Sequence, residues 1–470
     1  MSDSVSLSNN DLLVSENVSI LFDRLYPHLR SILGKGYRDS LEILKEYIPF
    51  ETEVYKSGTK VLNWSVPKEW EIDEAYIEDE SGKKVIDIKN CNLHVVNYSA
   101  PVDMVMPLSE LKSHIYTSSS DRKAIPYTIS YYKERWGFCM SKEQLESLPE
   151  GNYHAVIKSR FADGALVTGQ TVLEGQSKKE ILISTYLCHP SMANNELSGP
   201  LVQAILYQKI KAWKHRKYTY RFVINPETIG SIAYLSRYGN ELLDVLKAGI
   251  VLTCLGGEEE CLRIKLSKSA TAPFDVLTGS VNAYLSDKEK SELKVSALFK
   301  EESLKTGPFS VKAFDPAEGS DERQYCSCGF NLPVSQISRK TYGTYKEYHT
   351  SLDTKELMGI DNVIDSAQKI EALLKMLEDE QYYKTIYPYG EVKLGDYDLY
   401  PSINCDGVKS SDNELINSDP QFVRKVMFIL SYSDGTVPLS ELCKKPNCPL
   451  ENLKKICSVL VKKGLLKEDL

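Results

Sequence analysis

The sequence lacks the long apolar runs of membrane proteins and the dense cysteines of small secreted ones. No stretch approaches the roughly 18 apolar residues of a membrane-spanning helix. The opening residues, MSDSVSLSNNDLLVSENVS, show no basic segment followed by an apolar stretch and a cleavage site. The 11 cysteines are scattered and odd in number, unlike a disulfide framework. We therefore expect a protein of the reducing cytoplasm with no membrane partner.

An excess of positive charge is missing as well. The chain has 57 Lys and Arg against 65 Asp and Glu, a net charge of −8, which gives no general field for nucleic acid. The nearest cysteine pair, Cys326 and Cys328, has no second pair at the spacing of a structural zinc site. The glycines of GGEEE (256–260) lack the spacing of phosphate-binding loops. What remains is 470 residues, 42% of them hydrophobic, enough for about three domains with a buried core.

Hydrophobic patterns predict an α/β fold. Between about 126 and 380, β-rich runs such as ILISTYL and TYRFVIN alternate with helical patterns, which is typical of a mostly parallel sheet flanked by helices. Residues 18–50 predict two helices around a Gly-Lys-Gly break. We therefore assign 1–56 and 126–385 to one domain. Short alternating runs at 57–125 predict an inserted, all-β domain.

The C-terminal part predicts a separate small domain. Residues 386–418 are polar and rich in turn formers, as in a linker. Three helical patterns and a terminal hairpin in 419–470 indicate a winged helix. Residues 420–470 hold nine Lys or Arg against five Asp or Glu. Winged helices contact proteins as readily as DNA, so we expect nucleic acid as the lesser alternative, reached through this domain alone.

Four motifs place polar side chains where strands end. His189 lies in CHPSMANNELSGP (188–200), Glu227 follows TYRFVIN, Asp321 lies in GSDERQY, and His349 lies in EYHTSLDT. Ligands of parallel sheets bind at the carboxyl ends of the strands. Histidine and carboxylate groups hold zinc, and a further carboxylate takes a proton from water. Each residue alone could be structural, as a buried histidine or a helix-terminal carboxylate, but their combination favours a metal site.

These motifs also carry a family resemblance. CHPSMANNELSGP, PETIGSIAY, GSDERQY with GFNLPV, and YHTSLDT resemble, in order and spacing, the di-zinc aminopeptidase clan of leucyl aminopeptidases and glutaminyl cyclases. More closely, the chain resembles a bacterial aminopeptidase-like family, often found near surface-polysaccharide genes. That family combines the peptidase fold, an inserted β domain and a C-terminal winged helix. NWSVPKEW (63–70) and NLHVVNYSAPV (92–102) match the insertion.

The resemblance implies roles for particular residues. His189 and His349 match the clan's two histidine ligands. Asn195 stands where the clan has a bridging aspartate, and Glu196 beside it could supply the missing charge. Pro226-Glu227 replaces two adjacent glutamates, so we assign Glu227 as the general base, with metal ligation as the alternative.

Further positions point to an altered metal centre. Thr253 occupies the place of another aspartate ligand of the clan. Asp321 matches an acidic neighbour of the clan's metals and could be recruited as a ligand here. The resemblance therefore implies one zinc ion rather than two. Arg323 and Tyr342 could bind a substrate carboxylate or an oxyanion, or serve only as a surface ion pair and a packing aromatic.

Three functions remain open on the sequence. The first is a zinc-dependent, aminopeptidase-like hydrolase of an amide or N-terminal peptide bond, acting on a peptide or small amide. The second is an amidase for a modified sugar or other small conjugate, since fold alone does not decide substrate. The third is a catalytically altered protein that binds or regulates, because the ligand positions at Asn195, Pro226 and Thr253 have changed. A homo-oligomer is compatible with all three.

Overall fold

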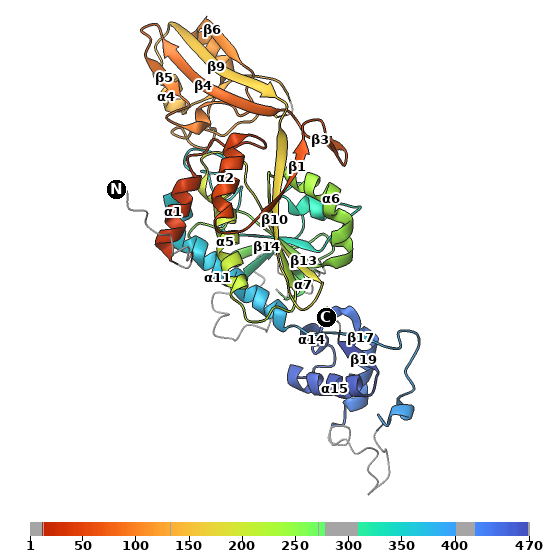
Figure 1. Cartoon of the computed structure of the whole chain (residues 1–470). Helices are drawn as coiled ribbons and strands as arrows, with labels where there is room; N and C mark the ends of the chain where they lie inside the picture. Colours follow the sequence, from red (N-terminus) through yellow and green to blue (C-terminus); the bar gives the residue numbers. More distant parts are fainter. Residues whose placement is uncertain are drawn as a thin grey trace, which may run out of the picture. The chain divides into compact units, whose positions relative to one another are not determined.

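The chain is described by a computed structural model that covers residues 12, 14–131, 133–270, 272–277, 309–400 and 419–468 (Figure 1). It divides into two compact units, Met1–Leu373 and Leu374–Leu470. Within the covered residues, no helix is long and apolar enough to cross a membrane.

The first unit is built on an eight-stranded sheet. From edge to edge its strands are β1 (Glu51–Lys56), β10 (Ala165–Leu173), β12 (Thr219–Asn225), β11 (Glu180–Tyr186), β13 (Leu246–Leu252), β16 (Val334–Ser338), β14 (Leu262–Lys265) and β15 (Phe309–Lys312). The four central strands β12, β11, β13 and β16 are parallel to one another. β1 and β10 pair with their neighbours in antiparallel fashion, and β14 is antiparallel to β16 but parallel to β15. The predicted α/β fold with a mostly parallel sheet is confirmed.

Burial explains why these strands form the centre. Every residue of β11 (EILISTY) and of β12 (TYRFVIN) is buried, as expected for parallel strands covered on both faces. Helices α1, α5 and α11 lie on one side of the sheet and α6 on the other (Figure 1). The helices are α1 (Ser15–Leu25), α2 (Lys35–Lys45), α5 (Ser198–Lys211), α6 (Ile229–Val245), α7 (Pro273–Leu277), α9 (Glu322–Tyr325), α10 (Lys355–Met358) and α11 (Ile360–Asp379). The two helices predicted at the start of the chain are α1 and α2.

A second sheet forms the inserted part of the first unit. Its order is β5 (Lys84–Asp87), β4 (Glu69–Asp79), β9 (Asn152–Ala162) and β6 (Val102–Pro107). Its central ladder joins β4 to β9. β9 therefore lies beyond the range 57–125 predicted for the insertion. Two small strand pairs accompany it, β2 (Lys60–Val61) with β3 (Trp64–Ser65) and β7 (Ile115–Tyr116) with β8 (Phe138–Cys139). Short helices are η1 (Asn92–His94), α3 (Leu108–Leu111), η2 (Lys112–His114) and α4 (Lys142–Ser147).

The C-terminal unit is a winged helix, as predicted. Its elements are β17 (Tyr382–Thr385), η5 (Leu394–Tyr397), α13 (Phe422–Tyr432), β18 (Asp434–Pro438), α14 (Leu439–Leu442), α15 (Leu450–Lys462) and β19 (Leu466–Glu468). β17 lies between β18 and β19 in the sheet, although it precedes the predicted domain 419–470. Leu394 and Leu399, from the segment predicted as a linker, are buried in this unit's core. Residues 401–418, the second half of that predicted linker, lie outside the described residues.

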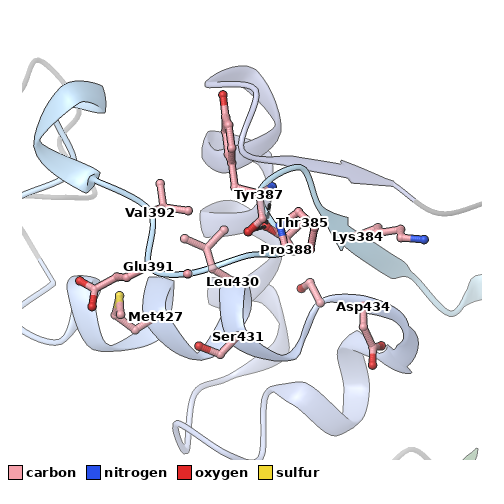
Figure 2. Close-up of a pocket in the computed structure, with 12 residues that line it drawn as sticks. Lys384, Thr385, Tyr387, Pro388, Glu391, Val392, Met427, Leu430, Ser431 and Asp434 are labelled. Atoms are coloured by element: carbon pink, nitrogen blue, oxygen red, sulfur yellow. Dashed lines mark hydrogen bonds between the residues drawn. The ribbon is translucent and has the colours of Figure 1, made fainter.

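The winged helix contains a pocket of its own. The segment after β17 and the helix α13 line it, and Figure 2 shows Met427 of α13 near Glu391, with Asp434 away from both. No residue predicted for the metal site lies there. The candidate site therefore belongs to the first unit.

Candidate metal centre

The loop after β11 carries the first histidine. β11 ends at Tyr186, and His189 follows two residues after Leu187, at the carboxyl edge of the sheet. The His189 side chain is 8% exposed. Its carbonyl oxygen accepts a 2.9 Å hydrogen bond from Nε of Arg30, which holds the loop in place. Ser191 takes a positive φ of 49°, so that the chain turns sharply towards the next helical turn.

Glu196 holds the ring of His189. Its Oε2 lies 2.7 Å from Nδ1 of His189, and its Oε1 accepts a hydrogen bond from the Cys188 backbone N–H. Arg30, itself fully buried, places Nε 3.9 Å from Oε1 of Glu196. A carboxylate bound to one imidazole nitrogen directs the other nitrogen outward, as behind histidine ligands of metals. Glu196 was predicted as a ligand, and here its oxygens are engaged behind His189.

His349 presents an unpaired nitrogen to the same space. Its ring centroid is 5.2 Å from that of His189, and Tyr127 makes edge contacts with both rings, at 5.4 and 5.1 Å. Tyr348 stacks on the His349 ring at 3.9 Å. Nε2 of His349 is buried and has no hydrogen-bond partner in the described part of the chain. Buried polar atoms are rarely left so, which indicates an absent partner at this position.

The two histidines differ in protonation. Burial acts to lower the pKa of His189, but Cys188 and Glu196 raise it well above its ordinary value. Burial, and then the charge of His189, lower the pKa of His349 well below its ordinary value. His349 is therefore neutral near pH 7, the form in which imidazole binds a metal, whereas His189 would release its Nε2 proton on binding one.

Glu227 completes the cluster. It follows β12 and Pro226, and its Oε2 lies 3.7 Å from Nε2 of His189. Oε1 accepts a 2.6 Å hydrogen bond from the Ser320 hydroxyl. The side chain is 27% exposed, so a substrate can reach it. Its burial among protein groups raises the pKa of the carboxyl, while His189 acts in the opposite sense. A raised pKa makes a carboxylate a better base near neutral pH.

Asp321 lies behind Glu227 and supports its loop. Its oxygens accept hydrogen bonds from Asn225 Nδ2 at 2.9 Å, the Thr228 N–H at 2.7 Å and the Ser231 hydroxyl at 3.0 Å. Thr228 has a φ of 64°, a strained value that these contacts hold. Burial, followed by the charge of Glu227, raises the pKa of Asp321 to about 7. Asp321 was predicted to be recruited as a ligand, and its oxygens are occupied by this loop.

The region where the clan would hold a second metal contains neutral groups. Oδ1 of Asn195 lies 3.4 Å from the hydroxyl of Tyr186, which lies 2.6 Å from that of Thr253. The nearby carboxylate of Asp353 accepts the backbone N–H groups of Asn194 and Asn195 at 2.7 and 2.9 Å. Asp353 therefore holds the turn that carries Asn194 and Asn195.

The two predicted substrate-binding residues contact neighbours of the cluster. Arg323 donates through Nε to the Ser320 carbonyl at 3.1 Å and through Nη1 to the Pro316 carbonyl at 3.4 Å. The ring centroid of Tyr342 lies 6.0 Å from that of Tyr348. Both residues therefore border the site through a neighbour.

The sequence did not reveal three members of this site. Cys188, His189 and Glu196 place donor atoms within 4.8 Å of one another, yet Cys188 was noted only as part of its motif. Ser320, next to the predicted Asp321, contacts Glu227. Arg30 lies far earlier in the chain, between α1 and α2, and no local pattern in the sequence distinguishes it.

Comparison with known proteins agrees with this arrangement. A family model described as a domain of unknown function, DUF4910, matches residues 20–380, and a winged helix-turn-helix model matches residues 381–468. The chain belongs to the DUF4910 family. The resemblance to an aminopeptidase-like family with a C-terminal winged helix is thereby confirmed. Binding of nucleic acid by the winged helix stays a prediction.

Two matches from Clostridium acetobutylicum, one found by sequence and one by structure, cover nearly the full length of this DUF4910 chain. One, described as a "putative polysaccharide biosynthesis protein with aminopeptidase-like domain", is 37% identical over 448 residues, 95% of each chain. The other is the crystal structure of a "putative peptidase", with a TM-score of 0.73 and 33% identity over 98% of each chain. A zinc aminopeptidase from Bacillus subtilis has a TM-score of 0.52 and 11% identity over 80% of this chain and 96% of that one, a likeness of fold alone.

Proposed function

We propose that this protein is a metal-dependent hydrolase that cleaves an amide, most simply an N-terminal peptide bond. The observation that carries the proposal is Nε2 of His349, a buried nitrogen with no partner among the described residues, whose ring lies 5.2 Å from the ring of His189. An unpaired buried polar atom costs about 1–3 kcal/mol. A zinc ion held by both imidazoles is the partner that removes this cost.

The residues present would offer one zinc ion two imidazole ligands, with a carboxylate close enough to be the third. His189 and His349 would hold it through Nε2, and the carboxylate of Glu227 borders the same space. Glu196 and Asp321 would act as positioning residues, because their oxygens already bind His189 and the loop that carries Glu227. A zinc site with an open position for water supports hydrolysis.

The chain's own groups would then perform the reaction. When bound, zinc lowers the pKa of a water molecule and polarises the scissile carbonyl. Glu227 takes the proton of the attacking water and delivers it to the leaving amine nitrogen. Ser320 holds one oxygen of Glu227 at 2.6 Å, which leaves the other oxygen for that proton. Tyr127 shields the two imidazoles by covering the edges of both.

One zinc is favoured over two by the neutral cluster beside the site. Asn195, Tyr186 and Thr253 bind one another through an amide oxygen and two hydroxyls. Neutral oxygens are much weaker bridges between two cations than carboxylates. A second ion there would lack the negative charge that it needs.

An amide on a modified sugar is a second candidate substrate. The 37% identical relative is described as a "putative polysaccharide biosynthesis protein", which points to a sugar substrate. A pocket of about 340 Å³ also lies near the site, lined by Trp64, Tyr131 and Asn63 among others. The hydroxyl of Tyr131 lies 3.0 Å from that of Tyr127, which contacts both histidines. Aromatic faces with an adjacent amide suit a ring with hydroxyl groups.

Metal analysis tests the proposal first. Protein purified without added zinc should contain close to one equivalent of metal, or take it up on titration. Less than about one tenth of an equivalent, with no affinity on titration, would favour the non-catalytic binding or regulatory alternative. A screen of aminoacyl p-nitroanilides and of N-acylated amino sugars with the metal-loaded protein then separates the two substrate classes.

A further inference from the structure

A small polar pocket lies at the edge of the main sheet. Strands β14, β15 and β16 form its floor, and the turn 341–344 and Glu318 form its walls. Its volume is about 280 Å³, at the lower end for ligand pockets, so it suits one substituent of a larger molecule. Its polar lining includes the side chains of Gln336, Ser338, Thr341 and Tyr342.

The pocket has an excess of positive charge. Three cations line it, namely Arg263, Lys265 and Lys312. Lys265 is buried and paired with Glu322, and Lys312 is paired with Glu318 at the rim.

Arg263 differs from the two lysines in its partners. In the part of the chain that is described, its side chain makes one hydrogen bond, from Nη1 to the Thr341 hydroxyl at 3.0 Å, and no carboxylate pairs with it. A guanidinium has five N–H donors, arranged as a fork that fits a carboxylate or a phosphate. Most of the fork of Arg263 is therefore available to a ligand.

Three features place this pocket near the candidate metal centre. Arg263 pairs with Ser338 at the end of β16, at the same carboxyl edge of the sheet that carries the histidine loops. Glu318 is two residues from Ser320, whose hydroxyl binds Glu227. Tyr342 lines the pocket and contacts Tyr348, which stacks on His349. The pocket is thus one layer of side chains from the proposed reaction site.

We propose that this pocket binds an anionic group of the substrate, a carboxylate or a phosphate, and that Arg263 is the residue that selects it. The inference rests on the proposed hydrolase function and names its substrate class: amides that carry an acidic substituent close to the scissile bond. Lys312 at the rim adds attraction, and the hydroxyl groups of Ser338 and Thr341 supply further hydrogen bonds.

The test uses the zinc-loaded full chain and two matched substrate pairs. L-glutamyl- and L-glutaminyl-p-nitroanilide differ only in a charge on the acyl side. The α-amides of L-alanyl-L-glutamate and L-alanyl-L-glutamine differ only in a charge on the leaving side. For one pair, kcat/KM should favour the acidic member by about 10- to 100-fold, the range of a charge-assisted pair. Arg263→Gln should remove that preference while changing kcat/KM for the neutral member by less than about threefold.

Further variants keep the test decisive. Arg263→Lys should retain part of the preference, because the charge remains and the fork is lost. If Arg263→Gln does not fold, Lys312→Gln at the half-exposed rim should still reduce the preference. Arg237→Gln, an exposed arginine of α6 paired with Glu53, should leave it unchanged. Glutarate and inorganic phosphate are then compared as inhibitors. Stronger inhibition by glutarate indicates a carboxylate site, and stronger inhibition by phosphate indicates a phosphate site.

Failure of the anion-pocket proposal and failure of the hydrolase proposal give different results. Turnover of all four substrates without acidic preference, and without inhibition by either anion, overturns the anion pocket and leaves the hydrolase standing. No turnover of any substrate counts against the hydrolase. Calorimetric titration with glutarate and phosphate then decides the pocket alone: binding that Arg263→Gln abolishes supports it, and no binding overturns it.

Discussion

Replacing the carboxylate of Glu227 by an amide is the sharpest test of the site. Glu227→Gln keeps the shape of the side chain, and Gln can still accept the 2.6 Å hydrogen bond from Ser320. It removes the proton acceptor that faces His189. A positioned general base contributes about 10²- to 10⁴-fold to a rate, or about 3–5 kcal/mol in the barrier. We therefore expect kcat to fall by that factor at unchanged metal content.

The assay measures both quantities on one sample. Metal content is determined by mass spectrometry. The turnover rate is measured with the best aminoacyl p-nitroanilide found in the screen. Glu356→Gln, an exposed change in α10, serves as the matched control and should retain wild-type kcat. A Glu227→Gln protein that loses its metal would make Glu227 a ligand, and one that retains both metal and more than half of kcat would refute its role in the reaction.

Three further predictions concern the metal and the core. His349→Ala should lose zinc binding, because one of two imidazole donors is removed, and elemental analysis should find less than about one tenth of an equivalent. Arg30→Met should lower the free energy of unfolding by about 3–5 kcal/mol, because it removes the buried guanidinium beside the Glu196 carboxylate and its hydrogen bond to the His189 carbonyl; urea denaturation measures this. Gly199→Ala should cost about 1–3 kcal/mol in the same assay, because a Cβ there would overlap the Thr185 hydroxyl.

Each of these changes has a matched control. His154→Ala, on the inserted sheet, should leave metal content at the wild-type value. Arg24→Met breaks a surface pair with Glu46 and should cost at most about 1 kcal/mol. Gly329→Ala would place its Cβ in open space and should be close to neutral. A core variant no less stable than its control would contradict the corresponding argument.

Topology explains why part of the site could be predicted from the sequence. His189 and Glu227 each directly follow a buried strand, and β11 and β12 are parallel neighbours, so their ends meet. The contribution of Arg30 could not be predicted in this way. It lies 159 residues before the carbonyl that it binds, and no local pattern marks one arginine as buried. The roles of Glu196 and Asp321 likewise depend on which hydrogen bonds their oxygens make, which spacing does not determine.

The inserted sheet shows the same limit of local patterns. The alternation in β4 is visible in the sequence, but its longest partner is β9, which returns after a stretch of turns and short helices. Tyr76 and its partner Val156 are 80 residues apart. Pairing at such separation depends on contacts between residues far apart in the chain, and a change in composition near 125 does not mark it.

The position of β17 has a consequence for how this protein can be divided. The strand between β18 and β19 is supplied by residues that precede a long polar segment. A fragment cut in that segment, where composition suggests the border, would carry two strands with a gap between them and an exposed row of unpaired backbone groups. A fragment of the winged helix should therefore begin before Tyr382, so that it retains β17, the central strand of its sheet. The same boundary applies to gene fusions and domain exchange.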